Sequence, residues 1–290
     1  MKKRKESFNI LCLNSRWDVF KFTYKTHFTF LMKLSFLLAL FALPLFVVVV
    51  MKGLFLEAIL SKLTESNQVE ILQQYFSMDI YMSLLYIPAF LIFSCGLAGG
   101  YTLIKKFSFQ EGYIFSKTFF MGIKENGKKF FGVTLFYSLI FYLMLFARDN
   151  ISMMNFKYYL PASLVMIIFI ILLLCNVIFA YGQIPIYTNS TFRTIKNAFL
   201  FTFYALPKTF LIFLVSIGPL FIVSFFSNTI LSAITILAYT IIGFGHMVLT
   251  TSLFTESYFD KVINETQFPS IYRKGLYHIE DDEEEDEEDV

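Results

Sequence analysis

The sequence predicts an all-α protein that crosses a lipid bilayer several times. Of its 290 residues, 57% are hydrophobic and only 16% are charged, and the mean hydropathy is +0.63. Soluble domains average about 45–50% apolar and about 25% charged residues, so this chain lacks the polar surface that a soluble globule of its size needs. Composition therefore excludes ordinary soluble enzymes, nucleic-acid-binding domains, disulfide-stapled secreted domains and disordered proteins.

Six apolar stretches are long enough to cross the membrane as helices. A span needs roughly 20 apolar residues, because the hydrocarbon is about 30 Å thick and a helix rises about 1.5 Å per residue. The expected spans are residues 28–51, 78–104, 130–147, 159–187, 208–226 and 229–253. Their centres hold no charged residue and no polar–apolar alternation, which argues against surface helices and against the strands of a β-barrel.

The distribution of basic residues predicts that both termini lie in the cytoplasm. One side of the expected membrane carries 20 of the 24 lysines and arginines, and the other side carries four. Cytoplasmic segments are the ones enriched in these residues. The chain then divides into a basic cytoplasmic segment at 1–27, a six-span membrane domain at 28–260 and a cytoplasmic tail at 261–290. Residues 280–289 are ten consecutive acids, which we expect to be solvated and extended by self-repulsion.

Two cytoplasmic connections are expected to form amphipathic helices that lie at the membrane surface. In 105–129 and again in 188–207, aromatic and aliphatic residues recur every three or four positions, as on one face of a helix. Basic residues lie between them. Their lysines could then reach anionic lipid headgroups. The similar order of Phe, Ile, Lys and Asn in both connections leaves an internal duplication open. On the opposite side, we expect a short amphipathic helix within 52–77 and a tight turn around Ser227–Asn228.

Several prolines and glycines fall within or beside the expected spans. A proline inside a helix frees a backbone carbonyl and bends the helix, either for packing or to line a substrate path. Gly96 and Gly100 are four residues apart, which allows two helices to approach closely, and we expect this contact within the chain. The residues concerned are Pro44, Pro88, Pro161, Pro185, Pro219, Gly96 and Gly100.

Few polar groups are expected at membrane depth. Asn176 and His246 form the candidate intramembrane polar site, and His246 is the ionisable one. The lack of a carboxylate deep in a span disfavours a proton- or sodium-coupled transporter. No hydrolase motif, phosphate loop or metal-ligand spacing is present. The sequence therefore predicts no catalytic residues, no metal and no cofactor, with Glu125 and Glu256 as scattered ionisable groups.

Residues 96–131 carry a recognisable pattern. Gly96–Tyr101 ends a span, Lys105-Lys106-Phe107 and Glu111-Gly112 follow, and an aromatic helix runs into Gly122–Lys129. This pattern resembles the YesL family of bacterial membrane proteins, also called the DUF624 domain. Tyr181 to Pro185 and Lys196-Asn197-Ala198 are similar to the second cytoplasmic element of that family. Four residues match the family motif and are the candidate interaction residues: Lys124, Glu125, Asn126 and Lys128.

The resemblance implies the bacterial plasma membrane and the context of carbohydrate uptake, including ABC sugar permeases. We therefore expect a non-enzymatic accessory to another membrane complex. The first alternative is a small-solute transporter or channel whose path is lined by proline-kinked helices. The second is a membrane-embedded enzyme, which would need clustered ionisable groups at the cytoplasmic face.

Overall fold

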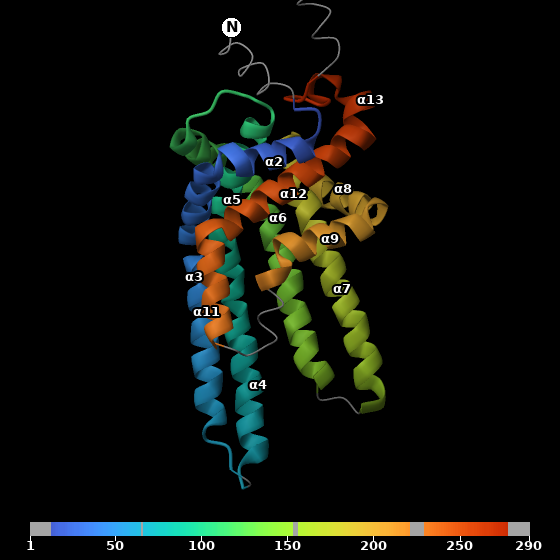
Figure 1. The fold of residues 1–290 in the computed structure, drawn as a ribbon. Coiled ribbons are helices and arrows are strands. Elements are labelled where there is room, and N and C mark those ends of the chain that lie inside the picture. Colours follow the sequence, from blue (N-terminus) through green and yellow to red (C-terminus); the bar gives the residue numbers. More distant parts are fainter. Residues whose placement is uncertain (1–12, 65, 153–155, 221–228, 278–290) are drawn as a thin grey trace, which may run out of the picture.

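The computed structural model describes residues 13–64, 66–152, 156–220 and 229–277, and this part of the chain contains helices and no strand (Figure 1). The all-α prediction is thus confirmed for the described residues. By length and composition, five of the described helices could cross a membrane, and a bent helix pair could make a sixth span.

Four long segments build two hairpins. The first hairpin consists of α3 (Phe28–Leu60) and of α4 (Gln68–Leu84) with α5 (Tyr86–Ser108). The second consists of α6 (Phe115–Ser152) and α7 (Phe156–Gln183). We call the end of the bundle that holds the α3–α4 connection the distal end, and the opposite end the terminal end, because residues 13 and 277 lie there (Figure 1).

Two expected short helices are instead parts of long ones. The short amphipathic helix expected within 52–77 does not stand alone, since α3 continues to Leu60 and α4 begins at Gln68. Likewise, the expected amphipathic helix before residue 130 is continuous with the third span in the 38-residue α6. At about 1.5 Å per residue, α3 and α6 are roughly 50 and 57 Å long, well beyond the hydrocarbon thickness. No proline interrupts these junctions, so hydrogen bonding simply propagates.

Prolines lie at the ends of some of the helices and inside others. Pro88 cannot donate to the carbonyl of Leu84, and α4 ends there. Pro44 and Pro161 lie inside α3 and α7, whereas Pro185 follows the end of α7. Pro219 comes shortly after α9 (Leu206–Ser216).

The fifth expected span is broken. The amphipathic helix expected in 188–207 is α8 (Thr191–Tyr204), which meets α9 at a bend of 102°. Pro207 in the first turn of α9 favours a new helix start rather than continuation. The end of the predicted 208–226 span and the predicted turn at Ser227–Asn228 lie outside the described residues.

The last span is long and carries two π-helical stretches. It comprises α11 (Thr229–Ala238), a π-helical turn at Tyr239–Gly243, α12 (Phe244–Phe259), a second π-helical turn at Asp260–Asn264 and α13 (Glu265–Gln267). The first described helix, α2 (Arg16–Thr26), contacts α12 at the terminal end. A short 3₁₀ turn, Pro269–Ile271, leads into the last described residues.

The buried core lies mainly in the terminal half of the bundle. Fully buried side chains come from α3, α5, α6, α7 and α12; the largest are Phe119, Phe130, Phe179, Phe259, Leu31, Leu34 and Leu249. Many apolar side chains of α7, such as Val165 and Ile168, are instead exposed on the bundle surface. In a membrane protein this exposed apolar surface is the part that lipid covers.

Small residues let α5 and α6 pack closely. A Cβ atom on Gly99 would lie 2.8 Å from the backbone oxygen of Phe119. A Cβ on Gly122 would lie 2.6 Å from Cβ of Thr102 and 3.0 Å from the carbonyl oxygen of Ala98. Gly96 and Gly100 face α3, where they meet Phe41 and Leu38 of the same chain.

We predict that Gly122→Ala destabilises the protein although alanine is the better helix former. Overpacking costs about 1–3 kcal/mol, which outweighs the roughly 1 kcal/mol gained in helix propensity. Gly127→Ala, also in α6, is the matched control, because its Cβ would meet only Ile123 at 3.8 Å. Thermal unfolding in detergent should give a lower Tm for the first variant and an equal or higher Tm for the second. An unchanged Tm for Gly122→Ala would contradict the close contact.

Candidate functional site: a buried ion-pair cluster at the terminal end

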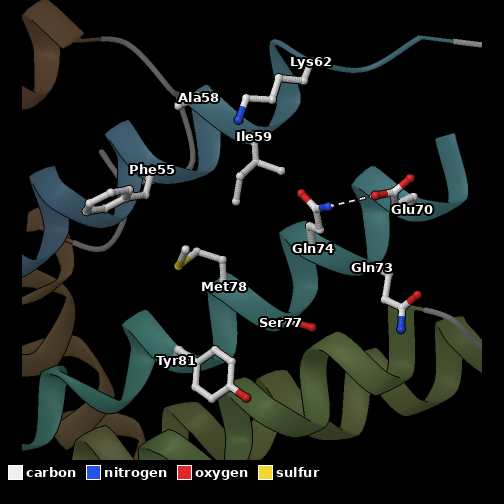
Figure 2. A pocket seen from close by; sticks show the side chains of 10 residues that line it. All are labelled: Phe55, Ala58, Ile59, Lys62, Glu70, Gln73, Gln74, Ser77, Met78 and Tyr81. Atoms are coloured by element: carbon white, nitrogen blue, oxygen red, sulfur yellow. Dashed lines mark hydrogen bonds between the residues drawn. The ribbon is translucent and has the colours of Figure 1, made fainter. Parts of the chain in front are cut away.

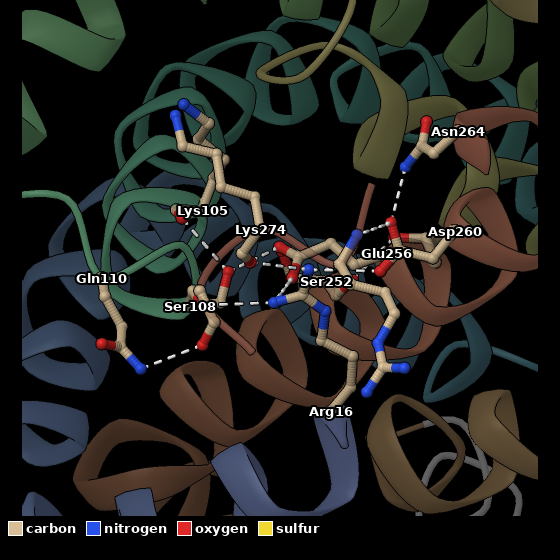
Figure 3. Close-up of polar contacts among 12 residues, drawn as sticks. Arg16, Lys105, Ser108, Gln110, Ser252, Glu256, Asp260, Asn264 and Lys274 are labelled. Carbon is tan, nitrogen blue, oxygen red and sulfur yellow. Dashed lines mark hydrogen bonds and ion pairs between the residues drawn. The ribbon is translucent and has the colours of Figure 1, made fainter. Parts of the chain in front are cut away.

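Arg16, the first residue of α2, lies at the centre of a buried polar cluster (Figure 3). Its side chain is 5% exposed. One guanidinium nitrogen donates to the carbonyl oxygen of Ser108 at 3.1 Å, and the other donates to Oδ2 of Asp260 at 3.2 Å and to the carbonyl oxygen of Lys274 at 3.0 Å. Arg16 therefore joins α2, the end of α5, the end of α12 and the C-terminal segment.

Two carboxylates share this one guanidinium. Glu256 is 1% exposed, and its Oε2 lies 3.5 Å from Arg16, while its Oε1 accepts a hydrogen bond of 2.9 Å from Ser108. Asp260 also accepts from Asn264 at 2.7 Å and from the backbone N–H of Arg273 at 3.2 Å. Glu256 and Asp260 are four residues apart, so they project from the same side of the helix. A buried charge is costly without a partner, which makes Arg16 the condition for burying both acids.

A second group of charges surrounds the ring of Phe109. Lys105 and Lys274 each lie 2.9 Å from Oε1 of Glu111, and both ammonium groups lie within 6 Å of the ring centre, as does the guanidinium of Arg16. Cations over an aromatic face are stabilised by the ring quadrupole. Partial burial alone would raise the pKa of Glu111, but hydrogen bonds from Lys274 and Lys105 hold the pKa below its usual value.

The backbone around the cluster is tightly tied together. Gln110 and Gly275 both have positive φ angles, of 53° and 79°, and Nε2 of Gln110 donates to the carbonyl oxygen of Gly275 at 2.9 Å. A Cβ on Gly275 would lie 2.4 Å from the carbonyl oxygen of Ser108, so only glycine fits this turn. These contacts hold the C-terminal segment against the α5–α6 loop.

Chemically, the arrangement is a clamp. Among the described residues of the cluster, no serine or cysteine is hydrogen-bonded to a histidine, and a positively charged arginine pairs with both acids. Within the described residues, no group of three or more His, Cys, Asp or Glu side chains is placed to hold a metal ion. The cluster is suited to holding four chain segments in one arrangement.

A smaller ion cluster lies toward the distal end. Asp79 of α4 is 3% exposed and contacts the ammonium of Lys52 in α3 at 2.8 Å and the guanidinium of Arg148 in α6 at 2.6 Å. Lys52 also donates to Ser83 at 2.8 Å. Asp79 thereby links the two hairpins electrostatically, since its partners come from one helix of each.

An open groove lies between α3 and α4 beyond this ion cluster (Figure 2). Its volume is about 600 Å³, and its walls combine apolar with amide and charged side chains: Phe55, Ala58, Ile59, Lys62, Glu70, Gln73, Gln74, Ser77, Met78 and Tyr81. Gln74 donates to Glu70 at 3.3 Å across one helical turn. None of the residues predicted as a site lines this groove.

The two predicted intramembrane polar residues do not form one site. Asn176 is fully buried in α7, where the hydroxyl of Tyr137 donates to its Oδ1 and its Nδ2 lies 3.4 Å from Thr202. His246 lies in α12, with Nδ1 2.6 Å from the hydroxyl of Tyr24. Each residue thus has hydrogen-bond partners of its own, on different helices.

The four residues predicted to mediate interactions play different parts in the structure. Lys124, Glu125 and Lys128 are exposed on α6. Asn126 instead donates from Nδ2 to Oγ1 of Thr102 at 3.0 Å and so connects α6 with α5. Three of the four side chains are consequently accessible to a partner or to lipid headgroups, and the fourth supports helix packing.

Sequence reasoning missed Arg16, Asp260 and Asp79 as members of buried clusters. Each lies outside the uncharged centre of a predicted span, where a charge gives no signal of burial. The i, i+4 spacing of Glu256 and Asp260 just after an apolar stretch was the one available hint, because it places two acids on one helix face. Their partner Arg16 lies more than 200 residues away in the sequence, and no local pattern connects them.

Comparison of the chain with protein-family models, with curated proteins and with solved structures gave no match.

We predict that Arg16→Gln destabilises the terminal end strongly. Removing one partner of a buried ion pair costs about 3–5 kcal/mol, because the remaining charge stays buried without compensation. Hydrogen exchange should speed up in α2 and in residues 268–277. Lys21→Gln removes the same charge from the same helix, but Lys21 pairs with Asp18 at the surface, where such pairs contribute at most about 1 kcal/mol. Equal exchange rates in the two variants would contradict the role of Arg16.

We also predict that Asp79→Asn loosens the contact between the two hairpins. The variant keeps the side-chain volume but leaves Lys52 and Arg148 close together without a carboxylate. Distances between spin labels on α4 and α6 should broaden, with a lower Tm. Glu70→Gln in the same helix is the control, because Glu70 is exposed and accepts a hydrogen bond from Gln74 one turn further along α4. Unchanged label distances in Asp79→Asn would show that packing alone holds the hairpins together.

Proposed function

We propose that this protein is a multi-pass membrane protein that serves as a non-enzymatic accessory to another membrane complex. The resemblance to the YesL family suggests a bacterial plasma membrane and a carbohydrate uptake system, such as an ABC sugar permease, as that complex. The proposed topology has six spans and both termini in the cytoplasm. It is supported by the hydrogen bond between Tyr277 and Leu13, because an even number of crossings returns the chain to the side where it began.

The observation that carries this proposal is the pairing of polar groups inside the bundle. Tyr101 of α5 lies 2.8 Å from Thr251 of α12, and Thr134 of α6 lies 2.9 Å from Tyr181 of α7. The backbone N–H of Gly245 in α12 donates to Ser35 of α3 at 2.7 Å. Buried networks whose members are satisfied by one another rigidify a single arrangement. That property suits a scaffold for a partner better than a path that opens and closes.

The proposed working surface is at the terminal end. Lys124, Glu125 and Lys128 are exposed on α6, and α8 exposes Phe192, Leu200 and Phe203 beside Arg193 and Lys196. Basic helices with exposed aromatic residues lie at membrane surfaces and attract anionic lipid headgroups. A basic, aromatic surface next to the membrane would also meet acidic segments of a neighbouring subunit.

A second candidate, a small-solute transporter or channel, is favoured by one feature of the fold. The hydroxyl of Tyr239, in the first π-helical turn, donates to the carbonyl oxygen of Ser216 at the end of α9 at 2.8 Å. The broken fifth span and the π-helical turn of the last span therefore meet. Irregular backbone at membrane depth is tolerated where it is buried in protein or lines a cavity, and π-helical turns are frequent at functional sites.

Co-purification and flux measurements separate the two candidates. Tagged protein isolated from native membranes should bring with it the subunits of a larger membrane complex, and deleting the gene should reduce uptake through that complex. Purified protein in sealed liposomes should show no solute flux above that of empty liposomes. Recovery as a lone protein together with flux that it supports by itself would replace the accessory role with transport.

We predict that the family-motif residues separate into a binding group and a folding group. Lys124→Ala combined with Lys128→Ala should reduce co-purification of the partner while the Tm stays unchanged, because both side chains are exposed. Asn126→Ala should lower the stability by about 0.5–1.5 kcal/mol, because it removes the hydrogen bond to Thr102. Lys62→Ala at the distal end controls for loss of charge. Normal partner recovery in the double variant would remove α6 from the working surface.

A further inference from the structure

The C-terminal segment is held at the start of α2. The backbone N–H of Tyr277 donates to the carbonyl oxygen of Leu13 at 3.1 Å. The guanidinium of Arg273 donates to the carbonyl oxygen of Asn14 at 3.1 Å. The ten consecutive acids, Glu280–Asp289, begin only three residues after Tyr277. The acidic segment therefore starts from a fixed point beside α2, whatever its own conformation.

The surface next to this point carries an excess of positive charge. We define the basic terminal face as Lys21, Lys25, Lys105, Lys106 and Lys274. Two contacts place α2 beside the end of α5, which carries Lys105 and Lys106. Arg16 contacts Ser108 at one end, and at the other the ring of His27, the residue after α2, lies 5.3 Å from that of Phe107.

Few acids compensate the basic terminal face. Glu111 is shared by Lys105 and Lys274, and Asp18 pairs with Lys21, whose side chain is still 58% exposed. Lys25 is exposed as well. Glu256 and Asp260 are buried and face Arg16. Over the whole expected cytoplasmic side, 20 basic residues face seven acidic ones when the segment 280–289 is set aside. The face therefore carries more positive than negative charge, whereas the adjoining segment is entirely acidic.

We propose that the acidic segment Glu280–Asp289 docks on the basic terminal face and competes there with anionic lipid headgroups. Ten extended residues reach at most about 35 Å, whereas the eleven residues of α2 are about 16 Å long, so the segment can follow the whole face. The attachment beside Leu13 keeps it at high local concentration. The contact shields the lysines from the membrane surface and opens as salt or anionic lipid replaces the carboxylates.

This inference rests on the part of the proposed function that places the working surface at the terminal end, where the basic terminal face also lies. Its test measures a contact within one chain, so it can fail or succeed independently of any partner complex.

The single tryptophan provides the probe. Trp17 lies on α2 and is exposed. In the full-length protein, Cys12, Cys95 and Cys175 are replaced by serine, and Val290→Cys adds a single thiol for an acceptor dye. The labelled protein is placed in nanodiscs of phosphatidylcholine. Energy transfer from Trp17 to the dye should be high at about 10 mM salt, where the Debye length is about 30 Å, and fall at least twofold at about 1 M, where it is about 3 Å. Excess unlabelled protein should leave the transfer unchanged.

Three comparisons make the result specific. In a variant with every acid of 280–289 replaced by its amide, the energy transfer should be low at every salt concentration, as it is for the native tail at high salt. Lys25→Gln should lower the salt concentration at which transfer is lost, whereas Lys62→Gln, at the distal end, should not. Nanodiscs that contain phosphatidylglycerol should lower the transfer at low salt. Equal transfer in the native and amide tails would overturn docking, and transfer insensitive to phosphatidylglycerol would overturn the competition with lipid.

Discussion

The burial of two carboxylates around one guanidinium is the constraint on which the terminal half of this protein depends. Glu256 and Asp260 are both buried, and Arg16 is the cation that pairs with each of them. That pairing positions α2 along α12, and the hydrogen bonds from Arg16 to the carbonyl oxygens of Ser108 and Lys274 position the α5–α6 loop and the C-terminal segment. The clamp thus connects the two ends of a chain whose hydrophobic spans could pack in several ways, and it supplies the specificity that non-directional apolar burial lacks.

The distal ion cluster also buries a charge among partners from different helices, but it contains a single acid, Asp79. Asp79 holds Lys52 and Arg148, and so joins the hairpins where small residues no longer bring the helices together. Between the two clusters, polar side chains such as Asn176 and Tyr101 bond to neighbouring helices. The interior is therefore organised by a few directional contacts at different depths, with aromatic and aliphatic packing between them. This organisation underlies the proposed scaffold role. The bend between α8 and α9 interrupts the otherwise continuous helices of the bundle.

Much of the fold followed from local patterns. Uninterrupted apolar stretches specify helices in a medium without water, since every backbone group must be satisfied within its own segment. The amphipathic character of 188–207 likewise indicated α8. Helix ends were predicted less well. The 130–147 span continues from α6 residues that were expected to form a separate helix, because lysines at its start do not stop hydrogen-bond propagation. The candidate site could not be predicted, since the residues next to Arg16 in the sequence give no sign that Arg16 is buried.

The sequence by itself determined that this chain is helical and that its apolar segments suit a membrane, because composition and periodicity act over a few turns of helix. Tertiary structure alone decided which charges are buried and with whom. Arg16 meets Asp260, and Arg148 meets Asp79, only after helices distant in sequence have packed. The free energy of a buried charge depends on the geometry of its partners, and that geometry exists only in the folded bundle.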